Sequence, residues 1–198
     1  MASDRRNGEE SASTRTAILD ATAEIMREQG YAAVSSRKVA ERAGLKSQLV
    51  HYHFGTMDEL FLALYQRYEE QYFQRHAQAL ASRNPLRALW DLSADPAGAA
   101  LSLEFIALAN HRKAIRKEIA RSTERYRSLQ VAVVSRVTED LGISEDEMPA
   151  DVLCFLLVAA SRALITEAAV GVTAGHAAMR AYVERRLQAL EDRAASKP

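Results

Sequence analysis

The chain has 198 residues, of which 48% are apolar and 26% are charged, and this length provides either one substantial core or a small domain joined to a larger one. Its 26 basic and 26 acidic side chains give a formal net charge of zero, which argues against a general polyanion binder but allows a local basic face. The polar N-terminus has no signal-peptide pattern, and the longest apolar run, Val152–Ile165, contains Arg162 and is too short to span a bilayer. We therefore expect a cytoplasmic protein with no membrane partner.

The sequence contains a single cysteine, Cys154, within the apolar run VLCFLLVAA. One cysteine excludes an intrachain disulfide and every metal site built from several cysteines. Free cysteines are most often buried as small apolar residues, and we expect the same of Cys154.

The chain begins with a polar arm followed by an amphipathic helix. Residues 1–12 are polar and charged without helical periodicity, which predicts a disordered arm. Apolar residues then recur at helical spacing and Gly30 follows as a terminator, so a helix is predicted from Ser13 or Thr14 to Gln29. Its apolar stripe consists of Ile18, Ala21 and Ile25.

The next segment, Ser35–Phe54 (SSRKVAERAGLKSQLVHYHF), predicts two short helices joined by a tight turn. Ser35 is a suitable N-cap for the first helix, and Gly44 is able to take the left-handed backbone that ends it. The second helix is predicted over Gln48–His53. Helix, glycine-containing turn and helix are the order found in a helix-turn-helix, whose second helix reads the major groove of DNA.

The same segment carries a local basic excess. Four bases and one acid give it a formal charge of +3 before any histidine is protonated: Arg37, Lys38, Arg42, Lys46 and Glu41. This local charge, in a chain of zero net charge, favours site-specific DNA binding over general binding of polyanions.

Helices are predicted for the rest of the chain. Thr56 and Glu59 form a capping box that begins a long helix, and Asn84-Pro85 breaks it. No segment alternates with the period of a strand, which predicts an all-α protein. The later helices are predicted over 86–93, from Pro96 to about 108, and over 111–141, 150–170 and 177–193.

Two segments, ILDATAEIMREQGYAAVSSRKVAERAG and HYHFGTMDELFLAL, resemble the N-terminal module of the TetR family of bacterial transcription regulators. The resemblance implies a helix-turn-helix DNA-binding domain at 13–56, a helical ligand-binding and dimerisation domain at 57–193, and a tail at 194–198. It also implies a homodimer whose last two helices pack into a four-helix interface. A ligand pocket inside the larger domain is expected to change the spacing of the two reading helices.

The chain departs from the family pattern inside the reading helix. Lys46 stands where a serine cap is usual, with Ser47 one place later, and Leu49 stands where threonine or alanine is usual. His51 stands in place of a phosphate-contacting tyrosine, and Met57 in place of a lysine. The operator sequence is therefore not carried over from the family.

We expect side chains of the second short helix to contact base edges. The Gln48 amide suits adenine N6 and N7, and Lys46 suits guanine or a phosphate. Leu49 either meets a thymine methyl or packs into the core. The side chains expected at phosphates, which set register without reading sequence, are Arg37, Ser47, His51, Tyr52, His53 and Thr56, the last together with the amides that begin its helix.

His51 and His53 do not predict a metal site, because residues two apart on a helix point to different faces and no third ligand is near in sequence. The chain has no nucleophile–base motif, no glycine-rich phosphate loop and no HExxH. We therefore expect no catalytic residue, no metal and no cofactor, and a protein that is not an enzyme.

In the larger domain, an apolar ligand is expected to contact aromatic and aliphatic side chains at helical spacing. Arg162 either reaches the surface, pairs with Glu167 or Glu104, or meets a polar ligand group. The candidate ligand residues are Trp90, Phe105, Tyr126, Leu129, Phe155 and Arg162. The candidate dimer residues are the small pair Ala159 and Ala160, together with the stripe Val183, Leu187 and Leu190 on the last helix.

The leading hypothesis from the sequence is a ligand-responsive repressor. Its homodimer binds a palindromic operator of double-stranded DNA and is released by a small, largely apolar effector. Two-fold symmetry places the two reading helices about 34–36 Å apart on one side of the duplex. The alternative is a DNA-binding regulator without a small ligand, either an activator or a sensor of a protein partner.

Overall fold

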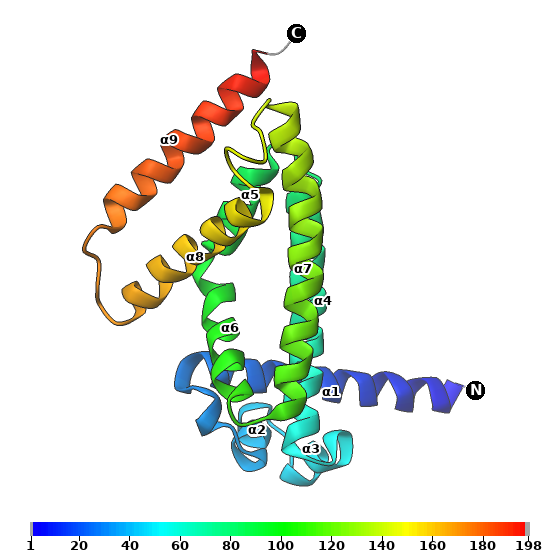
Figure 1. Ribbon diagram of the computed structural model, residues 1–198. Coiled ribbons are helices and arrows are strands. Elements are labelled where there is room, and N and C mark those ends of the chain that lie inside the picture. The colour runs from blue at the N-terminus through cyan, green and yellow to red at the C-terminus, as the bar shows by residue number, and fades with distance from the viewer. Residues whose placement is uncertain (1, 197–198) are drawn as a thin grey trace. The chain divides into compact units, whose positions relative to one another are not determined.

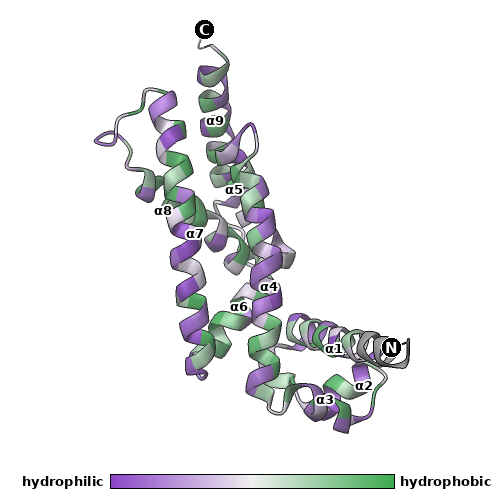
Figure 2. Ribbon diagram, turned by 90° about the vertical axis from the view of Figure 1, so that its right-hand side faces the viewer, coloured by the Kyte–Doolittle hydropathy of each residue, from purple (hydrophilic) through white to green (hydrophobic). Residues whose placement is uncertain are grey.

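The computed structural model describes residues 2–196, and within that range it contains nine α-helices, one short 3-10 helix and no strand (Figure 1). The prediction of an all-α protein is confirmed. Hydrophilic and hydrophobic residues lie side by side along the long helices in Figure 2, as expected of helices that bury one face. The elements are α1 (Ala2–Gln29), η1 (Tyr31–Ala33), α2 (Ser36–Arg42), α3 (Ser47–Phe54), α4 (Met57–Leu80), α5 (Pro85–Ser93), α6 (Pro96–Ala109), α7 (Lys113–Asp140), α8 (Ala150–Ala169) and α9 (His176–Ala195).

Helix α1 begins well before the predicted start. The structure is helical from Ala2, whereas the sequence predicted a disordered arm over 1–12, of which Met1 lies outside the described residues. Lengthening an existing helix costs much less than nucleating one, and residues 2–12 contain no proline to stop it. At the other end α9 continues to Ala195, inside the predicted tail, whose residues 197–198 lie outside the described part of the chain.

The chain packs as two compact units. The first consists of the residues up to Glu70 together with Ala100–Ala120, and the second of Gln71–Ala99 together with the residues from Arg121 onward. Helices α4 and α7 each contribute to both units. This division differs from the predicted boundary after residue 56, because side chains from the beginning of α4 and from α6 complete the core of the first unit.

The core of the first unit holds the two short helices against α1. Helix α2 packs on both α1 and α3 (Figure 1). Full burial of each large apolar side chain contributes about 1.5–3 kcal/mol, so these contacts account for most of the stability of such short helices. The buried side chains of this core include Ile18, Ile25 and Met26 of α1, Val39 of α2, Val50 and Phe54 of α3, Leu60 and Leu64 of α4, and Phe105 of α6.

Helix α6 is bound to the first unit by a carboxylate as well as by Phe105. One carboxylate oxygen of Glu104 accepts a hydrogen bond from the backbone N–H of Tyr31, with an N–O distance of 2.7 Å. A Cβ at the preceding Gly30, whose φ is +81°, would lie 3.4 Å from the same oxygen. Arg116 then donates to the carbonyl groups of Ala109 and Asn110 at 3.1 Å each, which satisfies the C-terminus of α6.

The second unit has a separate core built from α4, α5, α7, α8 and α9. Cys154 is 2% exposed in this core, as the sequence predicted, and burial raises the pKa of its thiol to about 11. The Arg87 guanidinium on α5 pairs with Glu184 at 2.9 Å and with Glu191 at 2.5 Å, both on α9. The buried residues include Leu86, Leu89 and Trp90 of α5, Val134 of α7, Cys154 and Leu164 of α8, and Val183 and Leu187 of α9.

Two of the predicted dimer residues therefore lie inside the chain. Val183 and Leu187 are 9% and 4% exposed and pack within the core of the second unit, with Leu190 half-buried against it. They are covered by α5, α7 and α8 of the same chain and are not available to a second subunit. The apolar stripe of the last helix is present, but it packs against the chain's own helices and not against a second subunit.

The hydrogen bond between Glu104 and Tyr31 gives a direct test of how α6 is held. We expect Glu104→Ala to lower the free energy of unfolding by about 1–3 kcal/mol, because the part-buried N–H of Tyr31 loses its acceptor. Glu104→Gln keeps an oxygen at the same place and should lose less. Urea denaturation of both variants checks this, with the exposed Glu139→Gln as the control for loss of one negative charge. Equal losses for Ala and Gln would contradict the assignment.

Candidate nucleic-acid interface

The turn between α2 and α3 has the predicted geometry. The backbone N–H of Lys38 donates to the hydroxyl oxygen of Ser35 at 3.3 Å, which caps α2. Gly44 has a φ of +67°, and the N–H of Leu45 then donates to the carbonyl of Ala40 at 2.8 Å. The Leu45 side chain packs against the core, as expected. Residues 36–54 thus form a helix-turn-helix.

Two bases of this segment are engaged within the chain. Arg42 pairs with Glu28 at 2.7 Å and with Glu24 at 3.2 Å, both on α1. The hydrogen bond from Arg42 lowers the pKa of Glu28. Lys38 donates its ammonium N–H to the side-chain oxygen of Gln29. The local charge of +3 is therefore an overestimate of what the segment offers to phosphates.

Helix α3 presents one face to the solvent and buries the other. Val50 and Phe54 are 2% and 4% exposed, one helical turn apart. Tyr52 is 79% exposed and lies on the outer face. The other exposed candidates are Lys46, Ser47, Gln48 and His51, with Arg37 exposed on α2, whereas Leu49 and His53 are half-buried.

The half-buried position of Leu49 agrees with both of its predicted roles, since part of the side chain packs inward and part remains accessible. The Tyr52 and His53 rings lie edge to face with their centres 5.2 Å apart. His51 places its Nδ1 atom 3.4 Å from the carbonyl oxygen of Gly55. Among the described residues, no group of three or more His, Cys, Asp or Glu side chains is placed to hold a metal ion.

The start of α4 is less suited to a phosphate than the sequence suggested. Thr56 is exposed, and its hydroxyl oxygen accepts a hydrogen bond from the N–H of Glu59 at 3.2 Å, as expected for a capping box. The first turn of α4, however, carries two acids, Asp58 and Glu59. Asp58 is paired with Arg112 at 2.7 Å, but the Glu59 carboxylate lies beside Gly55 and repels an incoming phosphate.

The predicted ligand residues do not form one group. Phe105 belongs to the core of the first unit and Trp90 to that of the second. Leu129 and Phe155 are 39% and 62% exposed. Tyr126 contacts the rings of Tyr72 and His76 on α4. Helical spacing identified the apolar residues but not which of them share a site.

Arg162 reaches the surface, which was one of its three predicted placements. The two acids considered as its partners make other contacts. Glu104 accepts the hydrogen bond from Tyr31, and Glu167 contacts the ring of His176 at 2.8 Å. Arg162 therefore has neither predicted ion pair.

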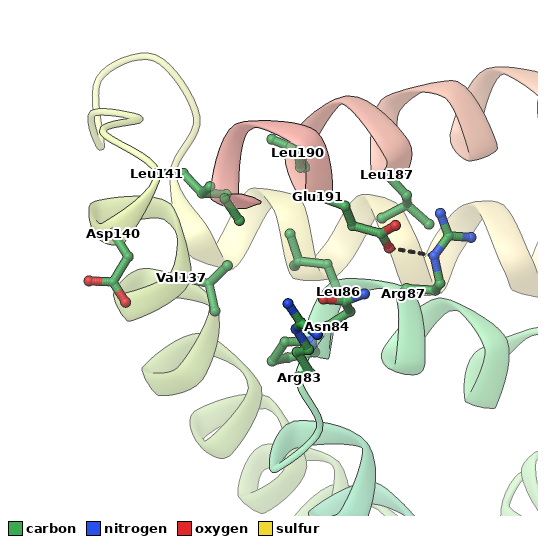
Figure 3. Close-up of a pocket in the computed structure, with 12 residues that line it drawn as sticks. Arg83, Asn84, Leu86, Arg87, Val137, Asp140, Leu141, Leu187, Leu190 and Glu191 are labelled. Atoms are coloured by element: carbon green, nitrogen blue, oxygen red, sulfur yellow. Dashed lines mark hydrogen bonds and ion pairs between the residues drawn. The ribbon is translucent and has the colours of Figure 1, made fainter. Parts of the chain in front are cut away.

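A pocket of about 230 Å³ lies between α5, α7 and α9 within the second unit (Figure 3). Its apolar wall includes Leu86, Val137 and Leu187, and the ion pair of Arg87 with Glu191 forms part of its rim. None of the predicted ligand residues lines this pocket.

The geometry of α2 and α3 defines a helix-turn-helix DNA-binding protein. Residues 18–64 match the family model described as bacterial regulatory proteins, tetR family. The HTH-type transcriptional regulator CymR of Pseudomonas putida is 28% identical over 150 residues, which cover 72% of this chain and 74% of that protein. The HTH-type transcriptional activator FasR of Mycolicibacterium smegmatis is 33% identical over 78 residues, 37% of this chain and 36% of that protein.

A solved structure shares the whole fold. The transcriptional regulator from Saccharomonospora viridis, determined in complex with choline, superposes with a TM-score of 0.73 at 21% identity, covering 91% of this chain and 95% of that one. The DNA-binding domain of the chain, with residues 18–64, is that of the TetR family of transcriptional regulators. The protein is a DNA-binding regulator and not an enzyme.

The two arginines of α2 offer a matched test of which bases contact phosphate. We expect Arg37→Gln to lower the slope of log affinity against log salt by about one per bound chain, because an exposed base that neutralises a phosphate releases counterions. Arg42→Gln should leave the slope unchanged, because Arg42 is already paired with Glu28 and Glu24. Fluorescence anisotropy with labelled duplex at several salt concentrations measures both. An equal loss of slope in the two variants would contradict the assignment.

Proposed function

We propose that the protein is a transcriptional repressor that binds a palindromic operator as a dimer and leaves it when a small effector binds. The observation that carries the DNA-binding part is the orientation of α3. Val50 and Phe54 anchor the helix, so Gln48 and Tyr52 face outward. A DNA-binding regulator must have access to the chromosome, and this requirement supports the expected cytoplasmic location.

Within this proposal the outward side chains have separate tasks. Gln48 reads adenine, and Lys46 contacts guanine or a neighbouring phosphate. Leu49 contributes apolar contact through its accessible part. Phosphate contacts from Arg37, Ser47, His51, Tyr52 and His53 set the register of α3 in the groove.

The dimer is proposed to form through the outer face of α8 and α9. A stripe of exposed apolar side chains follows α8 at helical spacing, consisting of Val152 (42% exposed), Phe155 (62%), Leu156 (51%) and the predicted dimer residue Ala159. Met179 and Tyr182 are 41% and 55% exposed on α9. Several large apolar side chains exposed on one helix face indicate an interaction site. Of the predicted dimer residues, Ala159 stays in this proposal and Ala160 is half-buried.

Helix α8 is also long and apolar enough, with 20 residues and a mean hydropathy of 1.8, to cross a membrane by those two criteria. The TetR-family DNA-binding domain and the buried face of α8, which includes Cys154 and Leu164, favour a subunit interface instead. Exposed Arg162 lies within the helix, where a lipid-facing charge is costly.

Effector control rests on the second unit. The Saccharomonospora viridis regulator with the same fold was determined in complex with choline. A small molecule that binds the DNA-free form more tightly shifts the protein away from DNA, and a coupling of about 1–3 kcal/mol changes DNA affinity about 5–150-fold. The similarity over 78 residues to an activator, FasR, keeps the activator as the alternative role.

Genomic-fragment selection with the purified protein tests the proposal. We expect enrichment of fragments that share a palindrome, and Gln48→Ala should broaden the preferred sequence at one position, with a loss of about 1–3 kcal/mol of discrimination. The exposed Gln66→Ala on α4 is the matched control. Enrichment of nothing above a salt-sensitive background would contradict the proposal.

The dimer face has a test of its own. We expect Leu156→Glu to weaken self-association by about a hundredfold or more, because a carboxylate would be buried without a partner at the interface. Sedimentation velocity over a range of protein concentrations measures it. Tyr52→Glu is the control, because Tyr52 is more exposed but lies on α3. An unchanged dimer in the Leu156 variant would exclude this face.

A further inference from the structure

Two side chains of the second unit carry buried nitrogen atoms that have no hydrogen-bond partner. Both ring nitrogens of His76 on α4 lack a partner, and the residue is 0% exposed. One terminal nitrogen of Arg127 on α7 is also inaccessible to solvent and unpaired. Leaving a buried donor or acceptor unsatisfied costs about 1–3 kcal/mol, and more when the group is charged. A cost of this size, borne twice, calls for a functional explanation.

The surroundings of His76 are aromatic. Its ring is stacked at 6.0 Å on Tyr72 and lies 5.4 Å from the ring of Tyr126 on α7. Phe73 lies 6.0 Å from Tyr126. Burial lowers the pKa of His76 to about 4, so the imidazole is neutral at physiological pH and offers one donor and one acceptor.

Arg127 directly follows Tyr126, the residue of α7 that meets His76, and Gln130 is a helical neighbour of both. Gln130 is 5% exposed, four residues after Tyr126 and three after Arg127, and side chains at these spacings are neighbours on a helix. The guanidinium of Arg127 lies 5.6 Å from the ring centre of Phe155, which offers no hydrogen-bond acceptor to the buried nitrogen. His76, Arg127 and Gln130 are named here the buried polar cluster.

We propose that the buried polar cluster binds the carboxylate of an effector whose remaining body is apolar or aromatic. Arg127 supplies the positive charge and a buried donor, and the neutral imidazole of His76 supplies a second donor. The rings of Tyr72, Phe73 and Tyr126 pack against the body of the effector. This inference rests on the proposed effector-responsive function and names the class of the effector.

The charges near the cluster disfavour a cationic effector. The guanidinium of Arg125 lies 3.9 Å from the ring centre of Phe73, and Arg127 is a second cation one helical position away from Tyr126. An ammonium group placed on the same rings would meet both positive charges. The aromatic side chains therefore serve an anionic or neutral compound, and the unpaired nitrogen of Arg127 selects the anion.

The first test needs no ligand. His76→Leu removes the unsatisfied nitrogens at similar volume, and we expect the melting temperature of the free protein to rise by about 2–4 °C. Thr138→Val is the matched control, because Thr138 is equally buried but its hydroxyl already donates to the carbonyl of Val134 at 3.0 Å. The control should show no rise. A fall in the melting temperature of His76→Leu would mean that the imidazole is satisfied in the free protein and would overturn the proposal.

The second test measures selectivity for the carboxylate. The probes are octanoate, cyclohexanecarboxylate and 4-tert-butylbenzoate, each compared with its primary amide by the shift in melting temperature. We expect the carboxylates to stabilise the wild-type protein by several degrees more than the amides. Arg127→Gln should remove this difference, and the exposed Arg136→Gln on the same helix should retain it. Equal shifts for acids and amides, or a difference unchanged in Arg127→Gln, would overturn the proposal.

The melting experiments contain no DNA, so they separate this inference from the proposed repressor function. Selective stabilisation by carboxylates in a protein that enriches no palindrome would support the cluster and contradict the repressor. Palindrome enrichment without any selective stabilisation would support the repressor and contradict the proposed role of the cluster.

Discussion

The burial of Val50 and Phe54 is the constraint on which the reading surface depends. Helix α3 has eight residues, too few to be stable alone in water, so its conformation comes from these two side chains packed into the core of the first unit. Their spacing of four residues sets the rotation of the helix. Gln48 and Tyr52, four residues apart, consequently face outward on the opposite side of the helix.

Pairing of charges within the chain determines how the neutral protein presents a basic surface. Arg42 and Lys38 are engaged by side chains of α1, which orients α2 but removes both bases from the phosphate-facing set. Arg37 and Lys46 remain exposed. A small number of unpaired bases gives weak affinity for DNA in general, so specific contacts contribute a larger share of the binding free energy.

Local signals predicted the first unit closely, because caps and turns depend on residues near in sequence. Ser35 and Gly44 acted as expected, and so did the apolar period of α3. An apolar stripe, however, shows only that a face is covered, not by what. Val183 and Leu187 turned out to face their own chain, while Phe155 faces solvent. The unpaired atoms of His76 had no sequence signature, since they follow from tertiary packing alone.

Trp90 is the single tryptophan of the chain, and it is 7% exposed in the core of the second unit. The emission of an indole depends on the polarity around it, so intrinsic tryptophan fluorescence reports structural changes in the second unit and not in the first. The aromatic residues of the first unit are tyrosines, phenylalanines and histidines. Trp90 is therefore an intrinsic fluorescent probe of the second unit. Its emission reports loosening of that unit in the unmodified protein and gives no signal from the helix-turn-helix.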